Sequence, residues 1–266
     1  MNRLDYLFLT AAAVLAVLVG RGARELTPRA APPRAAPEDL VGPVSVGTQT
    51  TLVSGDGSVG LEAVSAGGPR EPRSRPLDAG EVRRRLRVGQ AGTYIGELLI
   101  DHDSSLARWP DRTRSPLRVW VQPSSSVRHW RPEFVKHVRE AFTAWEGVGI
   151  PVRFTFVVDS ARADVHVAWI DHFDEPISGK TLWARDARWW IVDGNITIAV
   201  HHNEGDPLDA GAVRAIALHE VGHLLGLDHT ADTSNIMTPK VRVREISPAD
   251  RATARLLYTL PPGAVR

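Results

Sequence analysis

The sequence predicts an α+β fold in which helices pack against a mixed β-sheet. Three observations lead to this prediction. Several short segments alternate apolar and polar residues, which is the pattern of half-buried strands. One stretch between them has apolar residues three and four positions apart, which is the spacing of an amphipathic helix. The patterns come in the order strand, helix, strand, strand, and this order implies a mixed sheet with helices against it.

The first half of the predicted domain supplies three strands and one helix. The alternation covers three segments, 117–121, 152–158 and 165–169. Four apolar residues follow the helical spacing and are expected in the core: Phe134, Val138, Phe142 and Trp145. Pro132 and Glu133 suit the first turn of this helix, because proline lacks the unsatisfied N–H and acids favour a helix N-terminus. Gly147 is expected to end the helix.

The second half begins with a longer loop, Asp171–Trp190, which contains a short apolar piece at residues 181–184. Another strand is expected at Ile191–Val200. Asp209 is placed to cap a long helix at its N-terminus. The final helix begins at Ser247-Pro248-Ala249-Asp250, a capping box with proline at the first helical position.

The long helix carries a motif that runs from His219 to His229 in the pattern H-E-x-x-H-x-x-G-x-x-H. His219 and His223 are four residues apart, so on a helix their imidazoles lie on one face and can bind one ion. Gly226 can adopt a positive φ, which other residues reach only at a cost. The helix can therefore stop at this glycine, and the chain can turn sharply to bring His229 back as a third ligand.

This arrangement favours a catalytic zinc site. Zinc binds neutral imidazole, and catalytic zinc sites use three protein ligands and leave the fourth position for water. Glu220, beside the first ligand, can accept a proton from that water, whose pKa the metal lowers. A structural zinc site is the alternative, but such sites are closed by four protein ligands and have no use for the glutamate. We therefore predict one catalytic zinc with Glu220 as the general base.

The extended motif resembles that of the metzincin metallopeptidases, and within this clan the chain is most similar to the matrixins, the matrix-metalloproteinase-like family. Thr230 and Asp232 follow the third histidine as in matrixins. Met237 lies in a Met-turn of the form x-M-x-P at the matrixin spacing. Astacins and serralysins carry a tyrosine where this chain has Pro239. The resemblance implies that Met237 packs beneath the metal ligands as their floor.

The resemblance implies a metzincin-type zincin fold, with a mixed, twisted five-stranded sheet, three main helices and an active-site helix that carries H-E-x-x-H. By its position, the apolar piece at residues 181–184 resembles the matrixin edge strand that pairs with the substrate backbone. The implied substrate-binding residues are Leu182, Ala184, Ala215 and Pro239. Because Ala215 is small, we expect an apolar pocket that prefers leucine, isoleucine, methionine or phenylalanine after the scissile bond. The alternative is that Lys240 reaches into this pocket and favours an acidic residue.

The resemblance also raises the question of whether the chain binds further metal ions. Many matrixins hold a second, structural zinc, and His172 and Asp174 keep part of that site. Ala184 and Thr197 stand where its other histidines would be, which argues against a second zinc. Calcium is a further candidate cofactor, because residues 164 and 195 align loosely with a calcium site of the family. The acids of this loop would otherwise be solvated, since calcium needs many oxygen ligands.

Composition excludes several other classes of protein. The formal net charge of +1 argues against a dedicated nucleic-acid binder. The chain has no cysteine, so it has neither disulfides nor thiolate metal ligands. It also lacks the cysteine switch with which many matrixin proenzymes cap their zinc. No feature demands an oligomer, so we expect a monomer.

The predicted domains are residues 1–23, 24–105 and 106–266. The first opens with Arg3 and an apolar run at 6–19, which has the length of a signal-peptide core. A cleaved signal, an uncleaved anchor that meets a membrane through residues 4–19, and a buried helix are the three interpretations. The first two place the rest of the chain outside the cytoplasm, as a secreted, periplasmic or anchored protein.

The second predicted domain is rich in proline, arginine, alanine and glycine, which is typical of a linker or pro-region that is partly disordered. The third is the matrixin-like catalytic domain. We therefore expect a zinc endopeptidase that hydrolyses peptides or proteins outside the cytoplasm. An alternative from another class is a catalytically silent, zinc-containing protein that binds peptides or has a regulatory role. The intact Glu220 weighs against this alternative, because binding alone needs no general base.

Overall fold

The structure is a computed structural model that describes residues 58–62, 77–202 and 205–265, and for 58–62 it describes the backbone alone. The predicted signal or anchor, residues 1–23, lies outside the described residues, as does most of the predicted linker up to residue 76. Among the helices that the structure describes, none has the length and apolarity that a membrane crossing needs.

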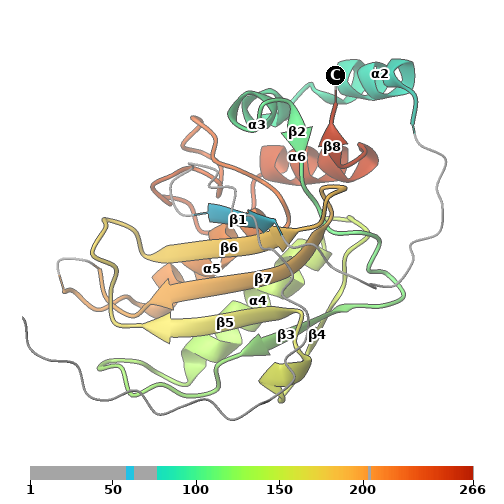
Figure 1. The fold of residues 1–266 in the computed structure, drawn as a ribbon. Coiled ribbons are helices and arrows are strands. Elements are labelled where there is room, and N and C mark those ends of the chain that lie inside the picture. Colours follow the sequence, from blue (N-terminus) through green and yellow to red (C-terminus); the bar gives the residue numbers. More distant parts are fainter. Residues whose placement is uncertain (1–57, 63–76, 203–204, 266) are drawn as a thin grey trace, which may run out of the picture. The chain divides into compact units, whose positions relative to one another are not determined.

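A mixed sheet forms the centre of the fold (Figure 1). Five of its strands come from the predicted catalytic domain: β3 (Leu117–Val121), β4 (Phe154–Phe156), β5 (Val165–Ile170), β6 (Gly179–Arg185) and β7 (Ile191–Ala199). Their order across the sheet is β6-β7-β5-β3-β4. The strands run parallel except β6, which is antiparallel to β7. The predicted α+β fold with a mixed five-stranded sheet is confirmed.

A sixth strand extends this sheet beyond the predicted edge. β1 (Ser58–Glu62) pairs in parallel with β6, and its residues lie opposite Thr181–Arg185. β1 belongs to the predicted linker or pro-region, whereas β6 is the strand predicted to meet substrate. The outer edge of β6 is therefore already paired by a segment of the same chain.

Two long helices cover one face of the sheet, as Figure 1 shows for α4 (Glu133–Glu146) and α5 (Ala210–Leu224). The predicted apolar face of α4 is fully buried. Trp145 on this face donates a hydrogen bond of 2.8 Å from Nε1 to the carbonyl oxygen of Leu218, which ties α4 to α5. α4 ends where the sequence predicts, with Gly147 as its C-cap.

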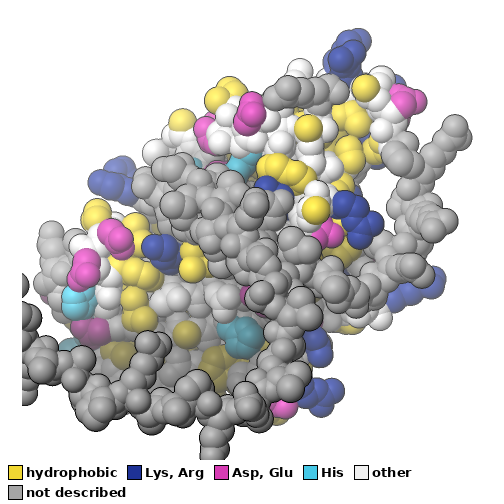
Figure 2. Space-filling view, in the orientation of Figure 1, with side chains coloured by type: hydrophobic (Ala, Val, Ile, Leu, Met, Phe, Trp, Pro, Cys, Tyr) yellow, Lys and Arg dark blue, Asp and Glu magenta, His cyan; other side chains and the backbone are white. Residues whose placement is uncertain are grey.

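Residues 77–104, which precede the predicted catalytic domain, form two helices, α2 (Ala79–Gly89) and α3 (Ile95–Asp101). Both contact the last helix, α6 (Pro248–Thr259). Figure 2 shows hydrophobic side chains gathered over this part of the molecule. The two helices bury three apolar side chains in the core, Val82, Ile95 and Leu98. The packed part of the chain therefore begins well before Leu106.

The remaining elements are short. A 3₁₀ helix, η1 (Ser160–Arg162), connects β4 to β5, and a two-stranded sheet pairs β2 (Ser105–Leu106) with β8 (Gly263–Ala264). β4 is shorter than the predicted strand at 152–158, because the chain leaves the sheet and Val158 is exposed. α6 begins with the predicted capping box, in which Ser247 and Asp250 bond each other's backbone N–H groups.

Candidate metal and catalytic site

Helix α5 fixes the first two histidines of the motif. Asp209 caps the helix as predicted, and its side chain accepts a hydrogen bond of 2.6 Å from the N–H of Ala212. The helix runs to Leu224, whose carbonyl oxygen accepts a hydrogen bond of 2.9 Å from Trp109 Nε1. His219 and His223 are both buried on this helix. The packing on both sides of α5 leaves the two imidazoles little freedom to move.

Gly226 turns the chain after the helix, as predicted. Its φ is +93°, which lies in the left-handed region that favours glycine. A Cβ at this position would also collide with the carbonyl oxygen of Ala107. Backbone conformation and close packing therefore both require glycine at the point where the chain turns towards His229.

The three histidines converge on one point. The Nε2 atoms of His219 and His223 lie 3.0 Å apart, and each lies 3.2 Å from Nε2 of His229. A tetrahedral zinc with Zn–N bonds of about 2.0–2.1 Å would separate its ligand nitrogens by about 3.3 Å. In the described part of the chain, these histidines form the one group of three or more potential ligands close enough to share an ion. The donor set therefore fits a zinc ion with three protein ligands.

Hydrogen bonds on the far side of the rings fix the tautomers of the two helix histidines. His219 Nδ1 lies 2.7 Å from the carbonyl oxygen of Ile236, and His223 Nδ1 lies 3.0 Å from that of Leu227. A carbonyl can only accept, so each Nδ1 carries the proton and each Nε2 presents a lone pair to the shared point. Burial lowers the pKa of His219 well below its usual value and that of His223 to about 4. Both rings are therefore neutral at physiological pH, as metal ligands must be.

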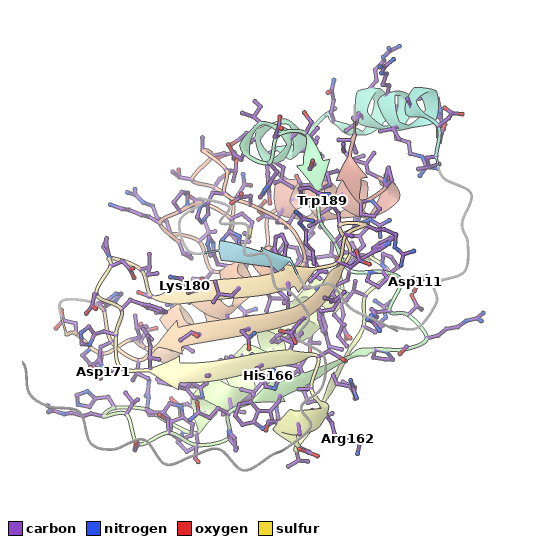
Figure 3. The ribbon with its side chains drawn as sticks, in the orientation of Figure 1. Asp111, Arg162, His166, Asp171, Lys180 and Trp189 are labelled. Carbon is purple, nitrogen blue, oxygen red and sulfur yellow. The ribbon has the colours of Figure 1, made fainter. Side chains whose placement is uncertain are left out.

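Glu220 points to strand β6 and not to solvent. Its Oε2 accepts a hydrogen bond of 2.6 Å from Oγ1 of Thr181, which also donates to the Glu220 carbonyl at 3.0 Å. A Cβ at Gly179 would collide with the carboxylate, so β6 needs glycine there. Gly179 and Thr181 are the two neighbours of Lys180 in β6, and Lys180 is labelled in Figure 3.

The environment of Glu220 changes its acidity. Burial raises the pKa of Glu220 to about 8, and the hydrogen bond from Thr181 opposes this rise. A metal dication at the neighbouring histidines would lower the pKa again, because positive charge favours the carboxylate. A carboxyl group in such a position can both accept and return a proton near neutral pH.

Met237 lies buried against the active-site helix. A Cβ at Gly222 would collide with the Met237 sulfur atom, so only glycine at residue 222 lets the methionine approach this turn of α5. Two hydrogen bonds from backbone N–H groups fix the Met-turn: Thr230 N donates to Met237 O at 3.0 Å, and Ile236 N donates to the side-chain Oδ2 of Asp250 at 2.9 Å. Met237 therefore packs against α5 beside Gly222, which lies between the two helix histidines in the sequence.

The residues predicted to contact substrate are spread over three segments. Leu182 and Ala184 are half-buried on β6, Ala215 is buried on α5, and Pro239 is exposed after the Met-turn. Lys240 is also exposed. The outer edge of β6 is paired with β1, so a peptide could pair with this edge only where β1 has left it.

The positions considered for further metals have other partners. His172 Nδ1 lies 2.7 Å from the carboxylate of its neighbour, Asp171. Asp164, considered for calcium, forms an ion pair of 2.6 Å with Arg118, and Asn195 donates to Asp193 at 3.1 Å. Arg118 therefore engages both carboxylate oxygens of Asp164.

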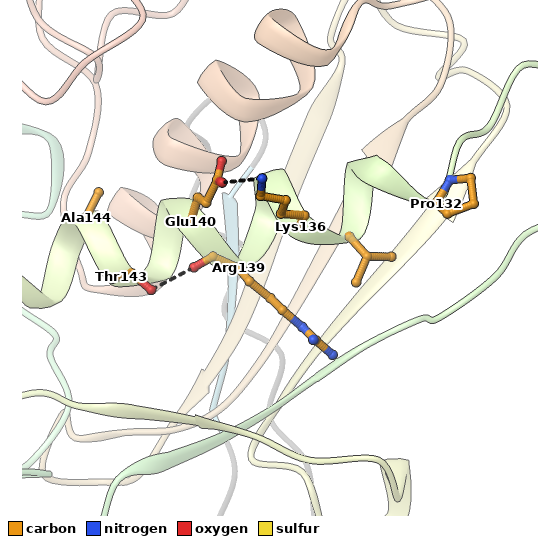
Figure 4. Close-up of a pocket in the computed structure, with 7 residues that line it drawn as sticks. Pro132, Lys136, Arg139, Glu140, Thr143 and Ala144 are labelled. Carbon is orange, nitrogen blue, oxygen red and sulfur yellow. Dashed lines mark hydrogen bonds and ion pairs between the residues drawn. The ribbon is translucent and has the colours of Figure 1, made fainter.

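A separate open hollow lies along α4, between its N-cap Pro132 and Ala144 (Figure 4). Its lining includes the ion pair Lys136–Glu140, with 3.7 Å between the charged atoms. None of its lining residues belongs to the histidine motif or to β6. The hollow is therefore a surface feature of α4 and not part of the candidate site.

Three residues of the site were missed by sequence reasoning: Gly179, Thr181 and Gly222. The two on β6 belong to a segment remote in sequence from the motif, and a single sequence does not reveal such pairings. Gly222 lies inside the motif at a position that its pattern leaves open, and the signal was a glycine in a helix interior, where it is unfavourable without a packing reason.

Comparison with known proteins agrees with this arrangement. The family model described as Matrixin matches residues 121–259. Metalloendoproteinase 1-MMP of Arabidopsis thaliana is 31% identical over 153 residues, which are 51% of this chain and 40% of that protein. Stromelysin-3 of Mus musculus is 30% identical over 168 residues, 58% of this chain and 32% of that protein. Metalloendoproteinase 4-MMP of Arabidopsis thaliana is 33% identical over 147 residues, which are 52% of this chain and 42% of that protein.

The chain spans less than half the length of each of these relatives. The family match nevertheless covers more than half of the chain itself. It extends from the last residue of β3, through the three histidines and the Met-turn, to the end of α6. Because one family model accounts for strands β4 to β7, the motif and the last helix together, the chain belongs to the matrixin family.

Proposed function

We propose that this chain is a zinc metalloendopeptidase that acts on peptides or proteins outside the cytoplasm. The observation that carries the proposal is the convergence of three histidine Nε2 atoms within 3.0–3.2 Å of one another, next to the buried Glu220. Zinc bound by these histidines would supply a Lewis acid that lowers the pKa of a water molecule and polarises a peptide carbonyl. The relatives whose names include metalloendoproteinase support the same activity.

The residues of the chain divide the remaining work. Glu220 would take a proton from the attacking water and later return it to the leaving amine. Thr181 would hold the Glu220 carboxylate in place through its 2.6 Å hydrogen bond. The backbone carbonyls of Ile236 and Leu227 keep the two helix histidines in the tautomer that exposes Nε2.

Substrate would bind along β6. An extended peptide can add to a free sheet edge through backbone hydrogen bonds, and the side chains that flank the edge then select among sequences. Leu182 and Ala184 on the strand, Ala215 on α5 and Pro239 after the Met-turn would supply these contacts. Because β1 occupies this edge, we infer that a substrate competes with the chain's own segment for β6.

Location follows from the N-terminal sequence. The apolar run at residues 6–19 supports a signal peptide or a membrane anchor, and either would direct the catalytic part out of the cytoplasm. The segment from residue 24 to the first packed helix would then serve as a linker or pro-region. Blotting fractionated cells of the source organism for the full chain would distinguish a released product from an anchored one.

The activity is tested with a pool of peptides and mass spectrometry of the products. The zinc-loaded chain should cut internal peptide bonds, a zinc chelator should abolish cleavage, and added zinc should restore it. A chain with prolines at Val59 and Gly60 is tested in parallel, so that pairing of β1 with β6 cannot hide the activity. Intact peptides with both zinc-loaded chains would exclude the endopeptidase and favour the silent, peptide-binding alternative.

A further inference from the structure

Helix α3 contacts the chain on both sides of the third histidine. It lies outside residues 121–259, the segment that the family model matches. His229 itself lies on an irregular segment after the Gly226 turn, whereas His219 and His223 are fixed by α5. The position of His229 therefore depends on what holds the residues next to it.

On the C-terminal side of His229, Glu97 of α3 holds the backbone. Its Oε2 accepts a hydrogen bond of 2.8 Å from the N–H of Ala231, and its Oε1 accepts one of 3.1 Å from Oγ1 of Thr230. Thr230 is buried, and its own N–H donates to Met237 O in the Met-turn. One carboxylate thus fixes the two residues that follow the ligand.

On the N-terminal side of His229, the residue after α3 holds the backbone indirectly, through the side chain of Asp228. His102 lies at the C-cap of α3, and its Nε2 is 2.8 Å from Asp228 Oδ2. The other oxygen of Asp228 accepts a hydrogen bond of 2.7 Å from the N–H of His229 itself. Asp228 is 5% exposed, so these bonds form away from solvent. A buried carboxylate with fixed partners on both oxygens is a rigid link from α3 to the ligand's backbone.

Helix α3 is itself firmly attached, which such a role requires. Ile95 and Leu98 are buried in the core. Tyr94, its N-cap, bonds α6 twice: its Oη lies 3.0 Å from Asp250 Oδ1, and its N–H donates to Thr253 Oγ1 at 3.1 Å. A displacement of α3 would therefore disturb the core, so the helix can serve as a fixed reference for the segment that carries His229.

We propose that Glu97 and His102 are positioning residues for the third zinc ligand, so that the metal centre includes a helix N-terminal to the matched family segment. The inference rests on the proposed zinc site. Partners beyond the direct ligands orient those ligands, and their loss typically weakens metal binding about 10- to 100-fold. Of the three ligands, His229 should be the most sensitive to the loss of such partners, because no helix fixes its backbone.

The test measures zinc affinity and zinc release by competition with a chromogenic chelator, on full chains. Glu97→Ala and His102→Ala should each weaken zinc binding about 10- to 100-fold and speed its release. Glu97→Gln keeps one acceptor oxygen and should recover part of the affinity. Asp101→Ala, on the exposed face of the same helix, is the matched control and should bind zinc like the natural chain.

Two further readouts separate positioning from general support of the fold. The absorption spectrum of the cobalt-substituted chain reports ligand geometry, and it should change in Glu97→Ala and His102→Ala but not in Asp101→Ala. The melting temperature of the zinc-free chains should stay close to that of the natural chain in Glu97→Gln. If zinc-free Glu97→Gln is unfolded while the zinc-free natural chain is folded, Glu97 supports the fold in general, and the proposal is wrong.

The outcomes distinguish this inference from the proposed function. If the natural chain binds no zinc, the proposed function fails. If the natural chain binds zinc and both alanine variants match its affinity within about twofold, well short of the effect of a lost orienting partner, α3 has no positioning role. Equal losses in Asp101→Ala would also contradict the inference, because they would show that any change in α3 weakens the site.

Discussion

At the scale of single residues, glycine decides how closely the parts of the site approach one another. Gly222 faces the Met237 sulfur and Gly179 faces the Glu220 carboxylate, and a Cβ at either position would collide with its neighbour. Thr181 supplies the one polar group of β6 that the structure places against Glu220. The packing around the motif therefore depends on glycine at residues 179 and 222 and on the hydroxyl group of Thr181.

Gly222→Ala tests this close packing. The added methyl group would collide with Met237, which is buried and also held by the Met-turn, so we expect a loss of about 1–3 kcal/mol in the free energy of unfolding. Denaturant unfolding of the zinc-free chain measures it. Gly96→Ala, in α3 with nothing within 4 Å of the new Cβ, is the matched control and should stabilise by about 0.5–1 kcal/mol. Equal effects of the two changes would contradict the account.

The Asp164–Arg118 pair should contribute a pH-dependent part of the stability. Burial alone would raise the pKa of Asp164, but hydrogen bonds from Arg118 lower it below its usual value. The stabilisation is therefore complete above the unfolded-state pKa and is lost as the pH falls through the folded-state pKa. Because the pair is partly exposed, its contribution should be about 0.2–1 kcal/mol at neutral pH.

Asp164→Asn measures this contribution. Chemical unfolding at a series of pH values should show the natural chain more stable than the variant near neutral pH. The two free energies of unfolding should converge in the acid range. A difference that stayed constant or grew with acid would show that Asp164 stabilises the fold by some means other than its ionised carboxylate.

At the scale of elements, the predicted helices and inner strands have the observed bounds within a few residues. α4, α5 and α6 were predictable because their caps and apolar spacing are local properties of the sequence. β6 extends from 179 to 185, beyond the predicted piece at 181–184, because pairing with β7 recruits residues that lack an apolar pattern. α3 was missed because its seven residues are too few to show a helical period in the sequence.

The pairing of β1 with β6 leads to a prediction about activity. Proline has no N–H, and N–H groups of successive residues in a strand point to opposite sides, so prolines at both Val59 and Gly60 must remove a bond towards β6. Freed from β1, the edge should accept substrate more readily, and turnover of a fluorogenic peptide by the full chain should rise. Prolines at Ala35 and Ala36 are the matched control. Unchanged or lower turnover in the β1 variant alone would show that β1 does not compete with substrate.

At the scale of the whole molecule, the site is assembled from segments that are far apart in sequence. The histidines and Glu220 were predictable because they occupy one continuous motif with a fixed chemical logic. Glu97, His102 and Thr181 reach the same site from α3 and β6, and nothing in a single sequence indicates which remote segments will pack together. The sequence therefore predicts the residues of the motif better than the remote residues that contact them.

Removing the metal should destabilise the whole fold. Without a cation, the buried lone pairs of His219 and His223 face each other at 3.0 Å with no partner charge between them. Zinc at a hundred times its dissociation constant should stabilise the folded chain by about 2.7 kcal/mol if it binds only that state. Calorimetry with and without a chelator should show a higher melting temperature in zinc. An identical melting temperature would mean that the histidines bind no zinc under those conditions.

The most direct test of the central claim is peptide turnover by Glu220→Gln at equal zinc content. Glutamine keeps the shape of the side chain and an acceptor for Thr181, but it cannot take a proton from water. We expect zinc content and melting temperature close to those of the natural chain, with turnover lower by about a hundredfold or more. Glu133→Gln, at an exposed carboxylate on α4, should be fully active. Near-native turnover by Glu220→Gln would contradict the account, because it would show that Glu220 is not the general base.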